Sequence, residues 1–246
     1  MADLPHAVRL DDVAVQYRVP RSQGLSLKAW AASRAWRQGH FAHQALRGVS
    51  LEVHQGESLA VVGANGSGKT TLLRVIARVM SPTSGRVRIR GRVAPILDVV
   101  GAIHPELTGR ENIVLNGTLL GLSRRETEAR LERIVDFAEI GPFIDAPMRT
   151  YSAGMVARLG FAVASDTDAD ILVIDEALGV GDERFQRKCA ARIDAILATG
   201  STFILVSHDM HTVRRLCSRA LWLDAGQVHA NGPVDDVVAA YQEAQR

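Results

Sequence analysis

The residues from Gly63 to Thr70 combine glycines, a lysine and a hydroxyl in the spacing G-x-x-x-x-G-K-[ST]. Glycines permit positive φ angles, so successive backbone N–H groups can turn inward around a phosphate. Lys69 would place its charge on the β- and γ-phosphates of a nucleotide, and the hydroxyl of Thr70 would bind Mg²⁺. The predicted phosphate-binding residues are Gly63, Ala64, Asn65, Gly66, Ser67, Gly68, Lys69, Thr70 and Thr71.

The elements around this loop favour a phosphate site over a chance glycine turn. Ser58–Val62 is apolar and β-branched, which predicts a buried parallel strand. A helix from Lys69 to about Met80 should follow, with the positive end of its dipole facing the same anion. Strand, loop and helix in this order predict a site for ATP or a related nucleoside triphosphate.

Two carboxylates follow a second apolar run, Ile171–Ile174. Asp175 at the end of this predicted strand would hold Mg²⁺ or its water, and Glu176 would polarise the attacking water as a general base. The alternatives are an acidic cap at Asp175 and a solvated neighbour at Glu176.

A histidine follows a third predicted strand, in STFILVSHDM. The carboxyl ends of parallel strands meet at one edge of a sheet, so His208 would face the same crevice. A lone histidine there would be structural, but beside the other two motifs a contact with the γ-phosphate is favoured.

Composition excludes several classes of protein. The chain has 246 residues, 47% of them hydrophobic and 23% charged, as in an ordinary globular domain. A net charge of +2 gives no field for nucleic acid, and the two cysteines, Cys189 and Cys217, lack metal-ligand spacing. No apolar run reaches roughly 18 residues, and the start, MADLPHAVRL, has no signal-peptide pattern. We expect a protein of the cytosol or of a cytosolic membrane face.

The segment TYSAGMVARLGFAVA lies shortly before the strand that ends in Asp175, and it resembles the signature loop of ABC transporter nucleotide-binding subunits. The usual L-S-G-G-Q reads Tyr151-Ser152-Ala153-Gly154-Met155 here. Together with LTGREN, IDEALGVGDERFQRKC and VSHDM, this variant resembles the ATPases that export O-antigen, capsule and teichoic acid.

The resemblance implies an α/β fold, that of a P-loop ABC ATPase. Its parts are a parallel-sheet core, a small antiparallel β subdomain and an inserted α-helical subdomain. The chain, residues 1–246, would be a single domain with its core at about 1–100 and 166–246 and its helical subdomain at about 104–165.

The signature has a physical meaning of its own, because Ser152 and the N–H groups around Gly154 begin a predicted helix, and such a helix end binds anions. The resemblance implies that Ser152, Ala153 and Gly154 close on the γ-phosphate held by a second copy, in a head-to-tail pair. It also implies that Asp182 lies in the loop joining the two copies. The alternative is an ordinary N-cap and turn.

Three further positions are interpreted through the resemblance. Tyr17 would stack on adenine, unless it packs locally as a strand tyrosine. Asp98 stands where most such ATPases have a glutamine, and it would reach Mg²⁺ through water or have no such role. The segment ELTGREN would meet a cytoplasmic helix of the permease, would form a helix cap with Thr108 and Glu111, or would do both.

Periodicity predicts the remaining elements. We expect strands over residues 7–19 and 46–57, and a strand pair over 85–93 with a tight turn at Arg90-Gly91. Helical periodicity runs from about Glu106 to Ser165, with a capping box at Ser123 and Glu126, and a terminal helix lies within residues 232–246.

An insert from Pro20 to Gln44 is far longer than a hairpin needs. It predicts a helix within residues 22–40, where Trp30 and Arg34 suit the headgroup layer of a membrane surface. The alternative is a surface helix with buried tryptophans and solvated arginines.

These patterns predict the ATP-hydrolysing subunit of an exporter of lipid-linked polysaccharide, peripheral on the cytoplasmic face of the plasma membrane. ATP and Mg²⁺ would be its cofactors. A second copy of the chain and two integral membrane permease subunits would be its partners, with no nucleic acid. The alternatives are the subunit of another exporter or importer, a soluble ABC ATPase acting on nucleic acid or ribosomes, and a binding module that never hydrolyses ATP.

Overall fold

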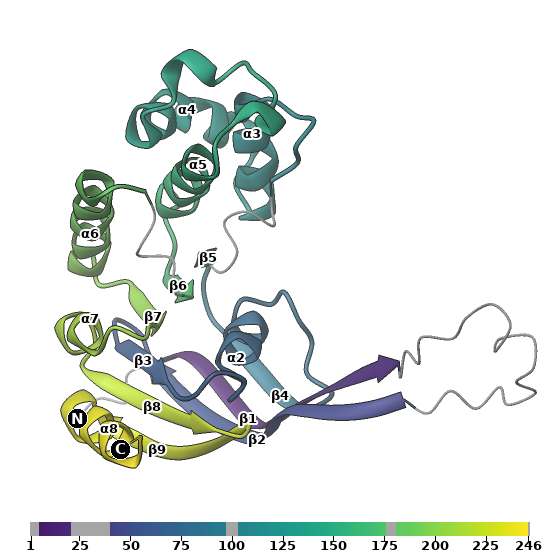
Figure 1. Ribbon diagram of the computed structural model, residues 1–246, viewed down its shortest axis with the longest axis vertical. Coiled ribbons are helices and arrows are strands. Elements are labelled where there is room, and N and C mark those ends of the chain that lie inside the picture. Colours follow the sequence, from purple (N-terminus) through teal and green to yellow (C-terminus); the bar gives the residue numbers. More distant parts are fainter. Residues whose placement is uncertain (1–4, 21–39, 97–102, 176–180, 246) are drawn as a thin grey trace, which may run out of the picture.

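The computed structural model of the chain describes residues 5–20, 40–96, 103–175 and 181–245, and Figure 1 shows their arrangement. Asp98, Glu176 and the helix predicted within residues 22–40 lie outside the described residues, so their roles stay predictions. No helix within the described ranges is long and apolar enough to cross a membrane.

The larger of two sheets has six strands, and its first five are parallel while the sixth is antiparallel. The strand order is β5 (Val93–Ile96), β6 (Ile171–Asp175), β7 (Thr202–Val206), β3 (Ser58–Val62), β8 (Arg219–Asp224) and β9 (Gln227–Pro233). The predicted strands Ser58–Val62 and Ile171–Ile174 are present, and the latter extends to include Asp175.

Side chains alternate along a strand, so this sheet has two apolar faces. One face, with Leu59 and Val61 of β3, shares a core with α2 (Lys69–Ile76) and the smaller sheet. The other face, with Ala60 and Val62, packs against a second set of helices, α6 (Glu183–Ala198), α7 (Met210–Leu216) and α8 (Val234–Ala244). Burial on both faces explains why these strands are apolar throughout.

The two cysteines belong to this second core, where both are free and buried. Burial raises the pKa of the Cys189 thiol to about 12, and it raises the pKa of Cys217 to about 12 as well. Both side chains therefore stay neutral and pack as small hydrophobic groups.

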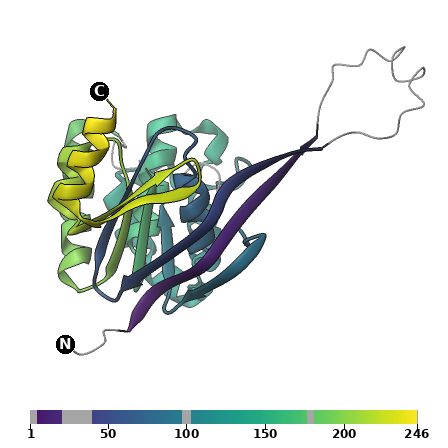
Figure 2. The ribbon, with the colours of Figure 1, turned by 90° about the horizontal axis from the view of Figure 1, so that it is seen from below.

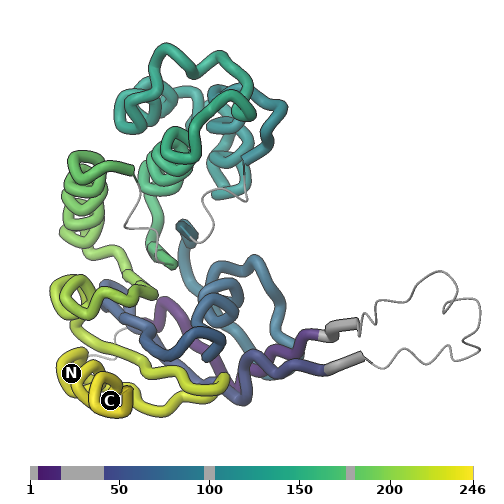
Figure 3. The backbone as a smooth tube through the Cα atoms, in the orientation of Figure 1, coloured from purple at the N-terminus to yellow at the C-terminus, as the bar shows by residue number. Residues whose placement is uncertain are grey.

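The smaller sheet is antiparallel, with the order β2 (His40–His54), β1 (His6–Pro20) and β4 (Ser84–Ile89). Figures 2 and 3 show β1 and β2 as a long pair whose far end extends away from the rest of the molecule. The near part of this pair packs on the core and supplies one wall of the candidate site.

The prediction of a strand pair over residues 85–93 is wrong. β4 pairs with β1 in the smaller sheet, whereas β5 pairs with β6 in the larger one. The amide of Arg90 still donates to Ala7 of β1, but the amide of Arg92 donates to the Asp170 carboxylate, 2.7 Å away, just before β6. Gly91, with φ of 100°, therefore carries the chain from one sheet to the other instead of folding it back.

The helix predicted from Lys69 to Met80 ends earlier, at Ile76. Arg78 adopts a left-handed φ of 59°, and the amides of Val79 and Met80 both donate to the carbonyl of Arg74. In a continuing helix the carbonyl of Arg74 would accept from the amide of Arg78, and this turn satisfies it with later amides instead.

The helices α3 (Gly109–Leu119), α4 (Arg124–Ala138) and α5 (Ala153–Ser165) form a group apart from the sheets, as Figure 3 shows. The short 3₁₀ turns η1 (Gly141–Phe143) and η2 (Met148–Thr150) connect α4 to α5. Both predicted capping boxes are present, at Thr108 with Glu111 and at Ser123 with Glu126. Together these elements are called the helical subdomain below.

Asp166, just after α5, is a charged link between the helical subdomain and the core. Its carboxylate is 8% exposed and accepts from Arg133 of α4 at 2.8 Å and from Arg192 of α6 at 3.2 Å. Because buried charge is costly unless it is paired, these arginines hold α4, α5 and α6 in one arrangement.

We predict that Asp166→Ala lowers the free energy of unfolding by about 3 kcal/mol, since it leaves Arg130, Arg133 and Arg192 around an emptied acceptor site. The neighbouring Asp168 is a matched control, because it pairs with Arg130 of α4 but is 82% exposed. Asp168→Ala should change the free energy of unfolding by less than about 1 kcal/mol. Urea denaturation followed by circular dichroism measures both, and equal losses in the two variants would contradict the role given to Asp166.

Candidate nucleotide-binding site

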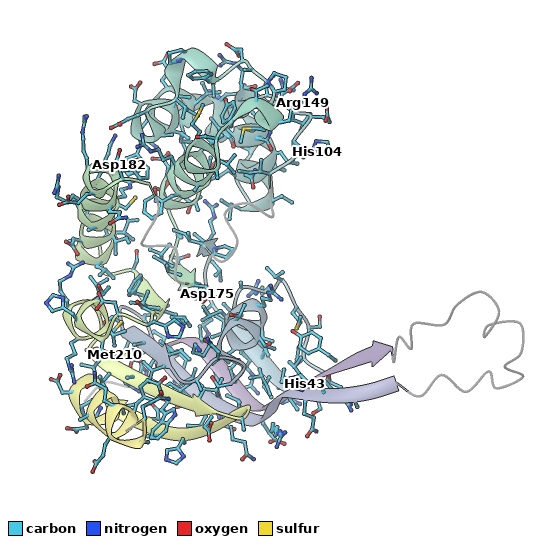
Figure 4. The ribbon with its side chains drawn as sticks, viewed as in Figure 1. His43, His104, Arg149, Asp175, Asp182 and Met210 are labelled. Atoms are coloured by element: carbon cyan, nitrogen blue, oxygen red, sulfur yellow. The ribbon has the colours of Figure 1, made fainter. Side chains whose placement is uncertain are left out.

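Strand register brings the three motifs of the core to one edge of the larger sheet. Val61 of β3 lies opposite Val206 of β7, and Val206 lies opposite Asp175 of β6. Neighbouring strands are about 4.8 Å apart, so Asp175 is about 10 Å from the strand that leads into the glycine loop. His208 follows β7 at the same edge, and Figure 4 shows Asp175 facing the space between the core and the helical subdomain.

Two glycines of the loop are required by close packing beneath it. Gly63 and Gly68 have φ angles of 151° and 105°. A Cβ on Gly63 would lie 2.2 Å from the carbonyl oxygen of Leu223, and one on Gly68 would lie 2.4 Å from that of Ala45. By contrast, nothing lies within 4 Å of a Cβ on Gly66. The loop is thus packed tightly against the chain at Gly63 and Gly68 and open to solvent at Gly66.

Lys69 places its ammonium group against this loop. Its Nζ donates to the carbonyl oxygens of Gly63 at 2.8 Å and Ala64 at 2.9 Å, and the residue is 7% exposed. The buried Oγ of Ser67, which has no hydrogen-bond partner within the described part of the chain, lies on the packed side of the loop, where a Cβ on Gly63 would be 2.7 Å from it. The buried ammonium group of Lys69, which lines the pocket beside the loop, fits an anion such as a phosphate.

A pocket of about 220 Å³ opens beside the loop. Its lining residues are Tyr17, His43, Ala45, Asn65, Gly66, Gly68, Lys69, Thr70 and Thr71. The hydroxyl of Tyr17 lies 3.3 Å from Oγ1 of Thr71 and donates to the sulfur of Met80 at 3.4 Å. Tyr17 therefore combines local packing with a place at the pocket wall.

His43 also lines this pocket, although no sequence pattern predicts it as a site residue. His43 lies directly opposite Tyr17 in the antiparallel register of β1 and β2, so their side chains share one face of the sheet. Figure 4 shows His43 on the core side of the long strand pair. Only that register, set across the insert, reveals His43, because its sequence neighbours have no distinctive pattern.

His208 is exposed at a rigid turn. The next residue, Asp209, caps α7 by accepting from the amides of His211 at 3.1 Å and Thr212 at 3.2 Å. The hydroxyl of Thr212 lowers the pKa of Asp209, with further help from these amides, so the cap stays ionised. This turn fixes the backbone of His208 relative to the sheet edge.

The described residues include no group of three or more histidine, cysteine or acidic side chains placed to hold a metal ion. Thr70 begins the exposed edge of α2, and Asp175 is half-buried at the end of β6. A hydroxyl and one carboxylate fit Mg²⁺ only when phosphate oxygens and water complete its shell, which is how Mg²⁺ binds beside a nucleotide.

The signature residues lie elsewhere. Ser152 is the N-cap of α5, and its Oγ accepts from the amide of Met155 at 3.2 Å. Ser152, Ala153 and Gly154 are exposed, and a Cβ on Gly154 would meet only the Oγ of Ser152, at 3.9 Å. Figure 1 shows α5 running through the helical subdomain toward β6, so its N-terminal end is the one farther from the larger sheet. A single chain does not bring the glycine loop and the signature together.

Asp182 is the N-cap of α6, where its side chain accepts from the amide of Phe185 at 2.8 Å. Its other oxygen accepts from Arg158 of α5 at 2.8 Å. The amide of Phe185 is the largest cause of a lowered pKa at Asp182, and the charge of Arg158 adds to it. The Asp182 carboxylate is therefore ionised and joined to the signature helix.

Comparison with known proteins identifies the family. The model of the ABC transporter family matches residues 46–179. The chain belongs to the ABC transporter family. O-antigen export system ATP-binding protein RfbB of Klebsiella pneumoniae is 48% identical over 81% of this chain and 81% of its own length. RfbB of Myxococcus xanthus is 42% identical over 99% of this chain. Teichoic acids export ATP-binding protein TagH of Bacillus cereus is 40% identical over 96% of it.

This ABC protein spans 57% of the Myxococcus relative and 42% of the Bacillus relative. Among solved structures, a dimeric post-hydrolysis state of the ATP-binding cassette MJ0796 with ADP and Pi aligns with a TM-score of 0.73, at 23% identity. It covers 92% of this chain and 98% of that one. An ATP-binding subunit of an ABC transporter aligns with a TM-score of 0.74, also at 23% identity, over 96% of this chain and 93% of that one. The predicted family and fold class are confirmed.

We predict that Lys69→Ala weakens ATP binding by about a hundredfold, because a buried cation that would meet the phosphates is removed. Arg86→Ala is the control, since it removes one exposed positive charge from β4 of the other sheet. Titration calorimetry measures both affinities. Equal affinities for ATP in Lys69→Ala and in the unchanged protein would contradict the phosphate role of Lys69.

Proposed function

We propose that the chain is the ATP-hydrolysing subunit of an exporter of lipid-linked polysaccharide, acting on the cytoplasmic face of the plasma membrane. The observation that carries the proposal is the separation of two anion-binding elements, the glycine loop and the N-terminus of α5, on different parts of one chain. Both are exposed, and each fits part of a triphosphate. The names of the relatives, which are O-antigen and teichoic acid export proteins, support the export role.

A second copy would complete the site. The first amides of an α-helix have no acceptor within it, and the Oγ of Ser152 satisfies only that of Met155. The amides of Ala153 and Gly154 would then donate to a γ-phosphate held by the glycine loop of the other copy. The space around Gly154 supports this arrangement, since nothing in its own chain requires a glycine there. The pair would be head-to-tail, with two such sites.

The hydrolytic step would use residues of the core. Lys69 would bind the β- and γ-phosphates, while Thr70 and Asp175 would hold Mg²⁺, which neutralises charge on the phosphates. Glu176 would accept a proton from the attacking water, and His208 would donate to the γ-phosphate. Asp98, at its position beyond β5, remains a proposed indirect ligand of Mg²⁺.

A groove between the core and the helical subdomain supports a permease partner. Its volume is about 850 Å³, and it runs between the end of α2, β5 and the end of α3. Val79 and Leu119 on its walls are 67% and 68% exposed, so the groove presents two large apolar side chains to solvent. Arg74 and Arg78 line it as well. We infer that a cytoplasmic helix of the permease, apolar on one face, docks here, and that two copies of the chain engage two permease subunits.

The segment ELTGREN lies at the start of α3, the opposite end of that helix from Leu119 at the groove. Thr108 caps α3 with Glu111, as one sequence-based interpretation expected, and Glu106 pairs with Arg149. The cap satisfies the local backbone, so a permease contact for the segment stays a proposal. The predicted helix within residues 22–40 would lie beside the same membrane surface, and the polysaccharide would reach the complex through the permease.

We predict that Glu176→Gln retains ATP binding but slows hydrolysis by roughly 10²–10⁴-fold, because the general base is lost while the phosphate contacts remain. ATP should then hold two copies together as a stable dimer. Phosphate release measures turnover, and sedimentation velocity with and without ATP measures assembly. Hydrolysis at the unchanged rate would refute the assignment of the base, and a monomer in saturating ATP would refute the composite site.

We also predict that Val79→Asp with Leu119→Asp reduces co-purification with the permease by at least about tenfold, since two charges would be buried in an apolar contact. The hydrolysis rate of the isolated subunit should stay unchanged. Ala239→Asp, on the exposed face of α8, is the control for an added charge. Undiminished co-purification of the double variant would show that the permease binds elsewhere.

A further inference from the structure

Arg158 lies in the second turn of the signature helix α5 and joins it to two other elements. Its Nη2 donates to Oδ2 of Asp182 at 2.8 Å, and its Nη1 lies 3.5 Å from Oε2 of Glu139. Its guanidinium also lies 4.9 Å from the centre of the Phe185 ring. The side chain is 20% exposed, so these contacts are partly shielded from water.

The Asp182 carboxylate divides its two oxygens between two helices. Oδ1 accepts from the amide of Phe185 and so begins α6, while Oδ2 accepts from Arg158 of α5. The preceding residue, Gly181, has φ of 76°, and a Cβ there would lie 3.3 Å from Nε of Arg158. Gly181 is therefore packed directly against the arginine.

Glu139 completes the contact from the other side. It ends α4 in a left-handed conformation, and its Oε1 accepts from Lys188 of α6 at 3.1 Å. Lys188 also donates to the carbonyl of Phe137 at 2.9 Å. The hydrogen bond from Lys188 is the largest cause of a lowered pKa at Glu139. Two carboxylates and their cations thus tie α4, α5 and the start of α6 together.

We propose that Arg158 is a positioning residue that holds the N-terminus of the signature helix and the Asp182 loop as one unit, so that both meet a second copy together. The inference rests on the proposed function, because it requires the head-to-tail pair. Without Arg158, Asp182 would still cap α6, and α5 would keep its own cap at Ser152, but the angle between the two would no longer be set by an ion pair. Assembly would weaken, while nucleotide binding by one copy, in a different part of the chain, would not.

The test uses the full chain carrying Glu176→Gln, in which ATP-dependent dimerisation is measured by sedimentation. Adding Arg158→Ala should raise the dimer dissociation constant about tenfold, in the range of coupling between contacting residues. The affinity of the monomer for ATP should change little. Arg158→Lys should lie between the two, because an ammonium keeps the charge but not the planar fork. Arg187→Ala is the control, since Arg187 pairs with Glu183 on the exposed surface of α6.

Asp182→Asn separates coupling from folding, because asparagine is also a good N-cap but carries no charge. When Asp182→Asn is combined with Arg158→Ala, the dimer dissociation constant should rise little beyond that of Arg158→Ala alone. Fully additive losses, or a dimer of Arg158→Ala as tight as its parent, would overturn the positioning role. A parent variant that stays monomeric in ATP would instead overturn the proposed function. If Arg158→Ala fails to fold, Arg158→Lys provides the test. A dimer dissociation constant of Arg158→Lys equal to that of the parent would overturn the inference.

Discussion

A triphosphate needs several N–H donors and a cation within a few ångströms, and the parallel sheet meets that need at its carboxyl edge. Because β6, β7 and β3 are in register there, Asp175, the turn at His208 and the glycine loop begin at nearly the same level. Packing beneath Gly63 and Gly68 then fixes the loop without any contact from above. The remaining parts of the site depend on this edge, since each is positioned relative to it.

The helical subdomain presents the N-terminus of α5 at its surface. α5 leaves its capped N-terminus exposed while its C-terminus runs back to β6, so the signature and Asp175 belong to one continuous connection. Charged links at Asp166 and Glu139 tie this connection to α4 and α6. A helical group packed in this way can transmit a displacement at the groove beside the end of α3 to the signature, because packed helices move as units rather than deform.

The proposed function explains one glycine that the fold of a single chain does not require. Loop glycines such as Gly63 are explained by contacts within the chain, whereas Gly154 is not. In a folded monomer, an exposed glycine at a helix N-terminus has no structural reason of its own. Under the proposed function, the amides beside Gly154 would meet a phosphate held by a second copy, and that contact would supply a reason for the glycine.

The sequence by itself determined the local chemistry: the glycine loop, the strands before it and before Asp175, both capping boxes and the family. Each depends on residues close together in the chain, where side-chain type and spacing set backbone geometry directly. Tertiary structure alone decided that β4 and β5 belong to different sheets, since Ala7 and Asp170, distant in sequence, accept from the amides of Arg90 and Arg92 on either side of Gly91. It also decided that His43 faces the pocket and that Arg158 meets Asp182, because strand register and helix packing bring together residues whose order along the chain carries no trace of the contact.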